Sequence, residues 1–109
     1  MEQKSWAQVV DNGERYLAVY PMLPAVYGRL GRANEELGRA EAAIQSYQRL
    51  LLLDPSDPVE VNYRLARLLQ PRDPVAAKRH LLEALADTPR FREGHKLLLT
   101  MPAPQEESQ

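Results

Sequence analysis

Apolar residues recur along this chain with the spacing of one face of an α-helix. The stretch 40–53 shows the pattern most clearly, with apolar side chains three and four residues apart at Ala43, Ile44, Tyr47, Leu50 and Leu51. Comparable stretches cover 6–21, 24–38, 58–70, 74–89 and 91–101. No segment alternates apolar and polar residues as a half-buried strand does. The pattern therefore predicts an all-α protein of about five helices joined by short turns.

Prolines divide the chain at a regular period. Pro21, Pro55 and Pro89 lie 34 residues apart, and each closes an apolar stretch that aligns with the other two without gaps. Such a period is typical of repeat proteins, in which helical units stack to bury a continuous core. We expect a single repeat domain over 1–101, made of a half repeat (6–21), two repeats (24–55 and 58–89) and a capping helix (90–101). Residues 102–109 lack apolar periodicity and are expected to be disordered.

Capping signals refine the expected helix boundaries. Ser5 has capping-box spacing to Gln8, which predicts a helix start at the residue after Ser5. Asp57 and Asp73 each precede a proline, a combination that predicts an acidic N-cap followed by proline in the first helical position. Gly38 follows an apolar helical face and is expected to end its helix in the left-handed conformation.

These residues resemble the tetratricopeptide repeat, a family whose unit is two antiparallel helices, A and B. The unit from Pro24 matches the family pattern at Tyr27, Leu30, Gly31, Ala43, Tyr47 and Pro55. The second unit keeps Ala77, Ala84 and Pro89, although its Leu65-Ala66 pair comes one residue late and Asn62 stands where the family usually has Trp. The resemblance implies an α-solenoid of antiparallel helix pairs in the order B, A-B, A-B, A. Gly31 and Ala43 would allow close approach of two helices, and Tyr47 would fill the gap between them.

The resemblance implies a non-catalytic scaffold that binds a peptide or protein in the concave groove lined by its A helices. The family's groove positions fall on Ala25, Gly28, Arg32 and Glu35 in the first repeat, on Glu60, Tyr63, Arg67 and Gln70 in the second, and on Glu93, Lys96 and Thr100 in the last helix. Arg32, Arg67 and Lys96 would form a basic stripe able to clamp an acidic peptide. The other interpretation is a solvated face whose arginines pair with Glu35 and Glu60.

The ends of the array suggest a second function. Trp6, Val10 and Tyr20 belong to a helix B whose own helix A is not evident in the sequence, so part of their apolar face would be exposed for association. Alternatively, Trp6 folds onto the first turn as a cap. The protein would then be a structural or oligomerisation module with homo-oligomer contacts through its unmatched ends, or an accessory region of a larger protein.

Composition argues against most other classes of function. The formal net charge is −1 with both signs interspersed, which gives no support to nucleic-acid or membrane binding. There is no cysteine, and His80 and His95 lack the further ligands that a metal site needs. We therefore expect no enzyme activity, no metal and no cofactor. The start of the sequence has no apolar signal-peptide core, which favours the cytoplasm without deciding it if the chain is a fragment.

Overall fold

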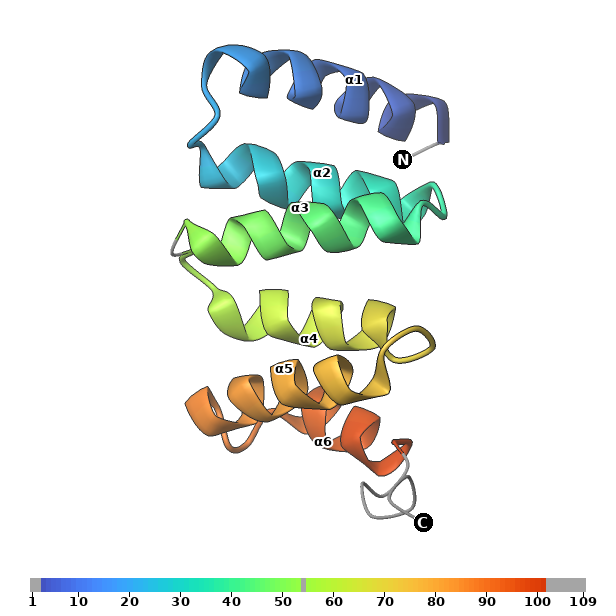
Figure 1. Cartoon of the computed structure of the whole chain (residues 1–109), viewed down its shortest axis with the longest axis vertical. Coiled ribbons are helices and arrows are strands. Elements are labelled where there is room, and N and C mark those ends of the chain that lie inside the picture. Colours follow the sequence, from blue (N-terminus) through green and yellow to red (C-terminus); the bar gives the residue numbers. More distant parts are fainter. Residues whose placement is uncertain (1–2, 54, 102–109) are drawn as a thin grey trace. The chain divides into compact units, whose positions relative to one another are not determined.

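The computed structural model describes residues 3–53 and 55–101, with side chains from Ser5 onward. The described residues form six helices and no strand: α1 (Gln3–Val19), α2 (Pro24–Glu36), α3 (Ala40–Leu52), α4 (Pro58–Leu69), α5 (Pro74–Asp87) and α6 (Arg92–Leu99) (Figure 1). The all-α class is confirmed. The count of about five helices is wrong by one, because each proline- or glycine-bounded stretch forms its own helix and the order B, A-B, A-B, A contains six. The disorder expected for 102–109 lies outside the described residues.

The helices divide into two compact units at Ser56 and Asp57. In the first unit, α2 packs against both α1 and α3, and in the second, α5 packs against both α4 and α6 (Figure 1). Successive helices within a unit run antiparallel, as short connections require. The single domain over 1–101 stays a prediction.

The first unit has two apolar contacts centred on α2. Between α1 and α2 lies a cluster of buried side chains, Val10, Val26, Leu30 and Ala33, with Trp6, Val9, Leu17 and Leu37 packed around it. On the other side of α2, Gly31 meets Tyr47 of α3 so closely that a Cβ on Gly31 would lie 2.5 Å from Cε1 of the Tyr47 ring. The expected pairing of a small residue with Tyr47 is therefore confirmed.

The second unit packs around the α4–α5 contact. Ala66, Leu81 and Leu85 are buried together, and Tyr63, Phe91, Leu97, Leu98 and Met101 pack against them. The side chain of α6 that lies farthest from this cluster in character is Leu99, which is 86% exposed. The second unit thus buries one face of α6 and leaves an apolar residue of the same helix in solvent.

The helix ends follow the predicted capping chemistry with one exception. Oδ1 of Asp57 accepts a hydrogen bond from the N–H of Glu60 at 3.2 Å, and Oδ1 of Asp73 accepts one from the N–H of Ala76 at 3.2 Å. Gly38 has φ 75°, as expected of a left-handed helix end. The start predicted after Ser5 is wrong: α1 already begins at Gln3, because the preceding residues are good helix formers.

Candidate interaction surface

In the first unit, the predicted groove residues lie on α2. Ala25 and Arg32 are exposed, and Gly28 and Glu35 are half-buried. The guanidinium carbon of Arg32 lies 5.6 Å from the centroid of the Trp6 ring, and its Nε lies 3.5 Å from Oε2 of Glu36. Arg32 is therefore held by α1 and by its own helix. An exposed ion pair of this length contributes little stability, so it can open to a ligand at small cost.

In the second unit, the predicted residues Tyr63, Arg67 and Gln70 follow one another along one side of α4. The guanidinium carbon of Arg67 lies 5.3 Å from the centroid of the Tyr63 ring, and that ring meets Phe91 edge-on at 5.1 Å between centroids. Nε2 of Gln70 donates a hydrogen bond to Oγ1 of Thr100 at 3.3 Å. The structure thus brings groove positions of two successive A helices, α4 and α6, into direct contact.

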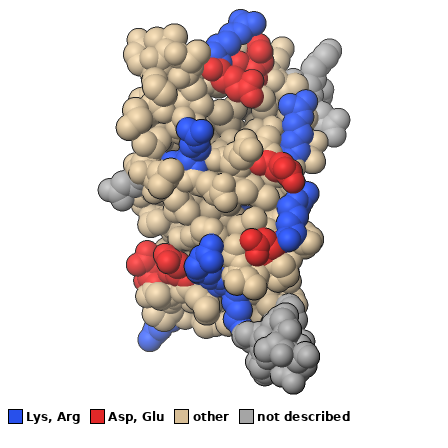
Figure 2. Space-filling model, in the orientation of Figure 1, with Lys and Arg blue, Asp and Glu red and all other residues tan. Residues whose placement is uncertain are grey.

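The remaining predicted charges have separate environments. Lys96 is exposed on α6 and forms no ion pair with the residues that the structure describes. Glu60 accepts a hydrogen bond from Nε of Arg64 at 2.7 Å, so its partner is the neighbour one helical turn along α4. Figure 2 shows basic and acidic side chains interspersed over the visible face. Ion pairs within single helices therefore account for part of the charge pattern, as the solvated-face interpretation expects.

A buried polar pair that the sequence analysis did not predict joins α4 and α5. Nδ1 of His80 lies 2.8 Å from Oδ1 of Asn62, a residue only 7% exposed. Since an amide oxygen can only accept, Nδ1 carries the hydrogen. Burial lowers the pKa of His80, the positive charge of Arg79 lowers it further, and Glu83 opposes the shift. The structure groups no three His, Asp or Glu side chains as a metal site among the residues it describes.

The residues predicted for association behave differently from one another. Trp6 is half-buried against the α1–α2 cluster, which agrees with its interpretation as a cap. Val10 was expected to be exposed, and this is wrong: it is 6% exposed because α2 packs directly over it. Tyr20 is 53% exposed just beyond the end of α1, where its ring lies 5.2 Å from that of Tyr16.

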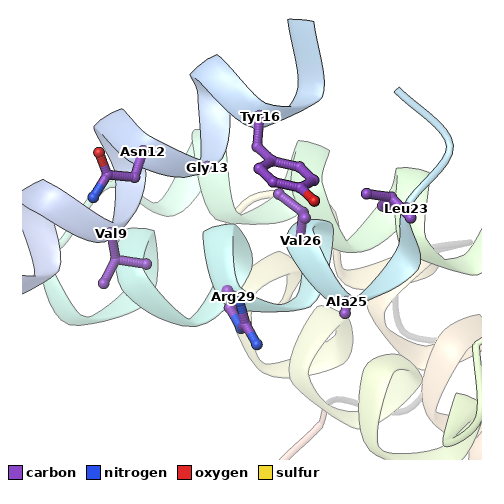
Figure 3. Close-up of a pocket in the computed structure, with 8 residues that line it drawn as sticks. All are labelled: Val9, Asn12, Gly13, Tyr16, Leu23, Ala25, Val26 and Arg29. Atoms are coloured by element: carbon purple, nitrogen blue, oxygen red, sulfur yellow. The ribbon is translucent and has the colours of Figure 1, made fainter. Parts of the chain in front are cut away.

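A pocket of about 480 Å³ opens between α1 and α2 (Figure 3). Its lining residues are Val9, Asn12, Gly13, Tyr16, Leu23, Ala25, Val26 and Arg29. The Tyr16 side chain extends from α1 toward α2, and Ala25 and Arg29 line the α2 side. Of these residues only Ala25 was predicted to take part in binding. The signal that could have found the α1 wall is the helical spacing of Val9, Asn12, Gly13 and Tyr16.

The family comparison agrees with this arrangement of helices. The family model of the tetratricopeptide repeat matches residues 24–57. The chain carries a tetratricopeptide repeat. In this repeat α2 is helix A and α3 is helix B, and the resemblance found in the sequence is confirmed. No curated protein matches the chain. Tetratricopeptide repeats generally mediate protein–protein interactions and are generally non-catalytic. None of the helices described is long and apolar enough to cross a lipid bilayer.

Proposed function

We propose that this protein is a non-catalytic interaction scaffold that binds a peptide or protein segment in the concave groove of its A helices. The observation that carries the proposal is the contact between α4 and α6, where groove positions of two successive A helices meet through Gln70 and Thr100. A peptide lying across these helices would meet both at once. The family's general role in protein–protein interaction supports the same conclusion.

We further propose that the ligand is acidic. Arg67, stacked on Tyr63, and Lys96 each present a cation on an exposed A-helix position. Stacking on an aromatic ring orients the planar guanidinium, so less side-chain entropy is lost when its N–H groups bind a carboxylate. Arg32 offers a comparable cation over Trp6 on α2. Ala25 and Gly28 leave space beside it, and Glu35 would set a limit on how acidic the neighbouring ligand position can be.

The test is a screen of labelled acidic peptides followed by charge reversal. The double variant Arg67→Glu/Lys96→Glu should weaken the best peptide by more than about tenfold, since a charge-assisted hydrogen bond contributes on the order of 1.5–3 kcal/mol. Arg79→Glu is the matched control, because Arg79 is exposed on α5, a B helix. Equal weakening by the control would mean non-specific attraction. Unchanged affinity in the double variant would exclude this binding surface.

The alternative that we propose is association of the protein with itself, as a structural module or as an accessory region of a larger protein. Its support is the set of large apolar side chains left in solvent near the first connection and on α6: Tyr16, Val19, Tyr20, Met22 and Leu99 are 51%, 66%, 53%, 70% and 86% exposed. Exposed apolar residues that gather in one place often mark an association site.

A further inference from the structure

Each complete A-B pair joins one small and one large residue at the same register. In the α2–α3 pair, Gly31 of helix A receives the ring of Tyr47 from helix B. In the α4–α5 pair, Ala66 of helix A is buried with Leu81 of helix B, and both are 0% exposed. Tyr47 and Leu81 lie 34 residues apart, one repeat period. The two pairs therefore fill the same interhelical position with different residues of complementary size.

The two helices that lack such a pairing in the described chain continue this register. Gly13 of α1 lies 34 residues before Tyr47, so a B helix here offers a small residue. Leu99 of α6 stands at the position of Ala66, so an A helix here offers a large one. Leu99 is 86% exposed whereas Ala66 is fully buried. The sizes remain complementary, with the roles of the two helices exchanged.

The buried polar pair repeats the same exchange. Asn62 of helix α4 bonds to His80 of helix α5. In the same register, Asn12 of α1 takes the place of His80, and His95 of α6 takes the place of Asn62. Nε2 of His95 lies 2.6 Å from the carbonyl oxygen of Pro89, which leaves Nδ1, the atom that His80 uses, to face a partner. An Asn–His pair would again form, with donor and acceptor helices swapped.

The pocket between α1 and α2 lies at the place where a helix A would pack. Its α1 residues Val9, Asn12, Gly13 and Tyr16 correspond to Ala43, Ser46, Tyr47 and Leu50 of α3, and all four of these are buried. In α5 the corresponding Ala77, Leu81 and Ala84 are buried and His80 is bonded to helix α4. The open pocket thus has the lining that a B helix elsewhere presents to its own helix A.

We infer that α6 of a second copy of this chain occupies the pocket, with Leu99 directed at Gly13 and His95 paired with Asn12. The inference rests on the association alternative above and is independent of peptide binding. The contact joins two different surfaces, so it does not close on itself and builds head-to-tail chains. One short helix buries less than the area of a standard interface, about 1,200 Å², so association is expected to be weak and concentration-dependent.

Complementary blocked variants test the arrangement. Leu99→Glu places a charge on the exposed donor helix, and Tyr16→Glu places one in the acceptor pocket. The wild-type mass in sedimentation equilibrium should rise beyond a dimer with concentration, and each variant alone should remain a monomer. A mixture of the two variants should form a one-to-one dimer that cannot grow, because each supplies the surface that the other has lost. Leu52→Glu is the matched control, since Leu52 is 82% exposed on α3 and should associate as the wild type does.

The outcomes separate the inference from the proposal beneath it. A wild-type protein that stays monomeric at millimolar concentration would overturn both the inference and the association alternative, and would leave peptide binding untouched. Association that persists in Leu99→Glu would overturn this arrangement while keeping association itself. The same holds for a mixture that forms no dimer. Circular dichroism of each variant establishes that a lost mass is not lost helix.

An exchange of the polar pair tests the register. Asn12→His places two histidines opposite each other, and His95→Asn places two asparagines, so each single variant should weaken association at least about threefold. The double variant Asn12→His/His95→Asn restores the pair and should associate within about twofold of the wild type, as coupled residues do in a double-mutant cycle. Weakening by the double variant equal to the sum of the singles would overturn the Asn–His contact.

Discussion

The two complete helix pairs solve one packing problem in different ways. The α2–α3 pair places a glycine against a tyrosine ring, and its buried Asn34 turns back to donate to the Leu30 carbonyl of its own helix at 2.9 Å. The α4–α5 pair places an alanine against a leucine and uses Asn62 to reach across to His80. The comparison shows that a degenerate repeat keeps the fill of an interhelical position and can change the residues, and that only one of the pairs here couples its packing to a titratable group.

Removing the large member of a pair should have the largest effect. Leu81→Ala deletes a fully buried side chain against Ala66, which cannot expand to fill the space. We expect a loss of about 3 kcal/mol in the free energy of unfolding, measured by urea denaturation followed by circular dichroism. Leu82→Ala is the control, since Leu82 is 47% exposed and should change stability by less than about 0.5 kcal/mol. Equal losses in the two variants would contradict the pairing of Leu81 with Ala66.

Enlarging the small member should have the next largest effect. A Cβ at Gly31 would lie 2.5–2.8 Å from three atoms of the Tyr47 ring, whereas one at Gly28 would meet only Cδ2 of Leu50 at 3.7 Å. Gly31→Ala should therefore cost about 2 kcal/mol through overpacking, despite the better helix propensity of alanine. Gly28→Ala should instead stabilise the protein by up to about 1 kcal/mol. If both substitutions stabilise in the same denaturation experiment, the close approach at Gly31 is not what separates the two pairs.

How much of this could be predicted from the sequence depends on the range of the interactions involved. The helices follow from apolar spacing, and the Asp57 and Asp73 caps and the Gly38 turn follow from chemistry within a few residues. The Gly31–Tyr47 contact could be predicted because the family pattern links the two residues. The start of α1 was misplaced because Ser5 resembles a cap locally while helix propensity continues upstream.

The candidate surface was harder to predict because it depends on how helices lie against one another. Val10 and Tyr16 both look apolar and exposed on an unpaired helix, yet α2 buries Val10 and leaves Tyr16 at the pocket. The Asn62–His80 pair joins residues 18 apart on two helices, and no local pattern identifies it. The positions of Gln70 and Thr100 were assigned by repeat register, and their contact tests that register only within the second unit.

The polar pair predicts the smallest effect and the one most specific to the second unit. Burial and Arg79 lower the pKa of His80 below its ordinary value of 6.5, and Glu83 only partly opposes them. The folded protein therefore binds fewer protons here than the unfolded chain. Stability should be complete above pH 6.5, should fall as the pH drops from there toward the folded pKa, and should level off below it.

His80→Gln removes this titration while keeping an amide that can donate to Asn62. The free energy of unfolding of the variant, measured by urea denaturation at several pH values from 7.5 down to about 5, should depend less steeply on pH than that of the wild type. Comparing the two proteins cancels the carboxylates, which titrate in both. The same slope in both proteins would mean that His80 ionises alike in the folded and unfolded states. The α4–α5 pair would then differ from the α2–α3 pair in shape alone, and the interhelical Asn–His contact would carry no pH dependence into the fold.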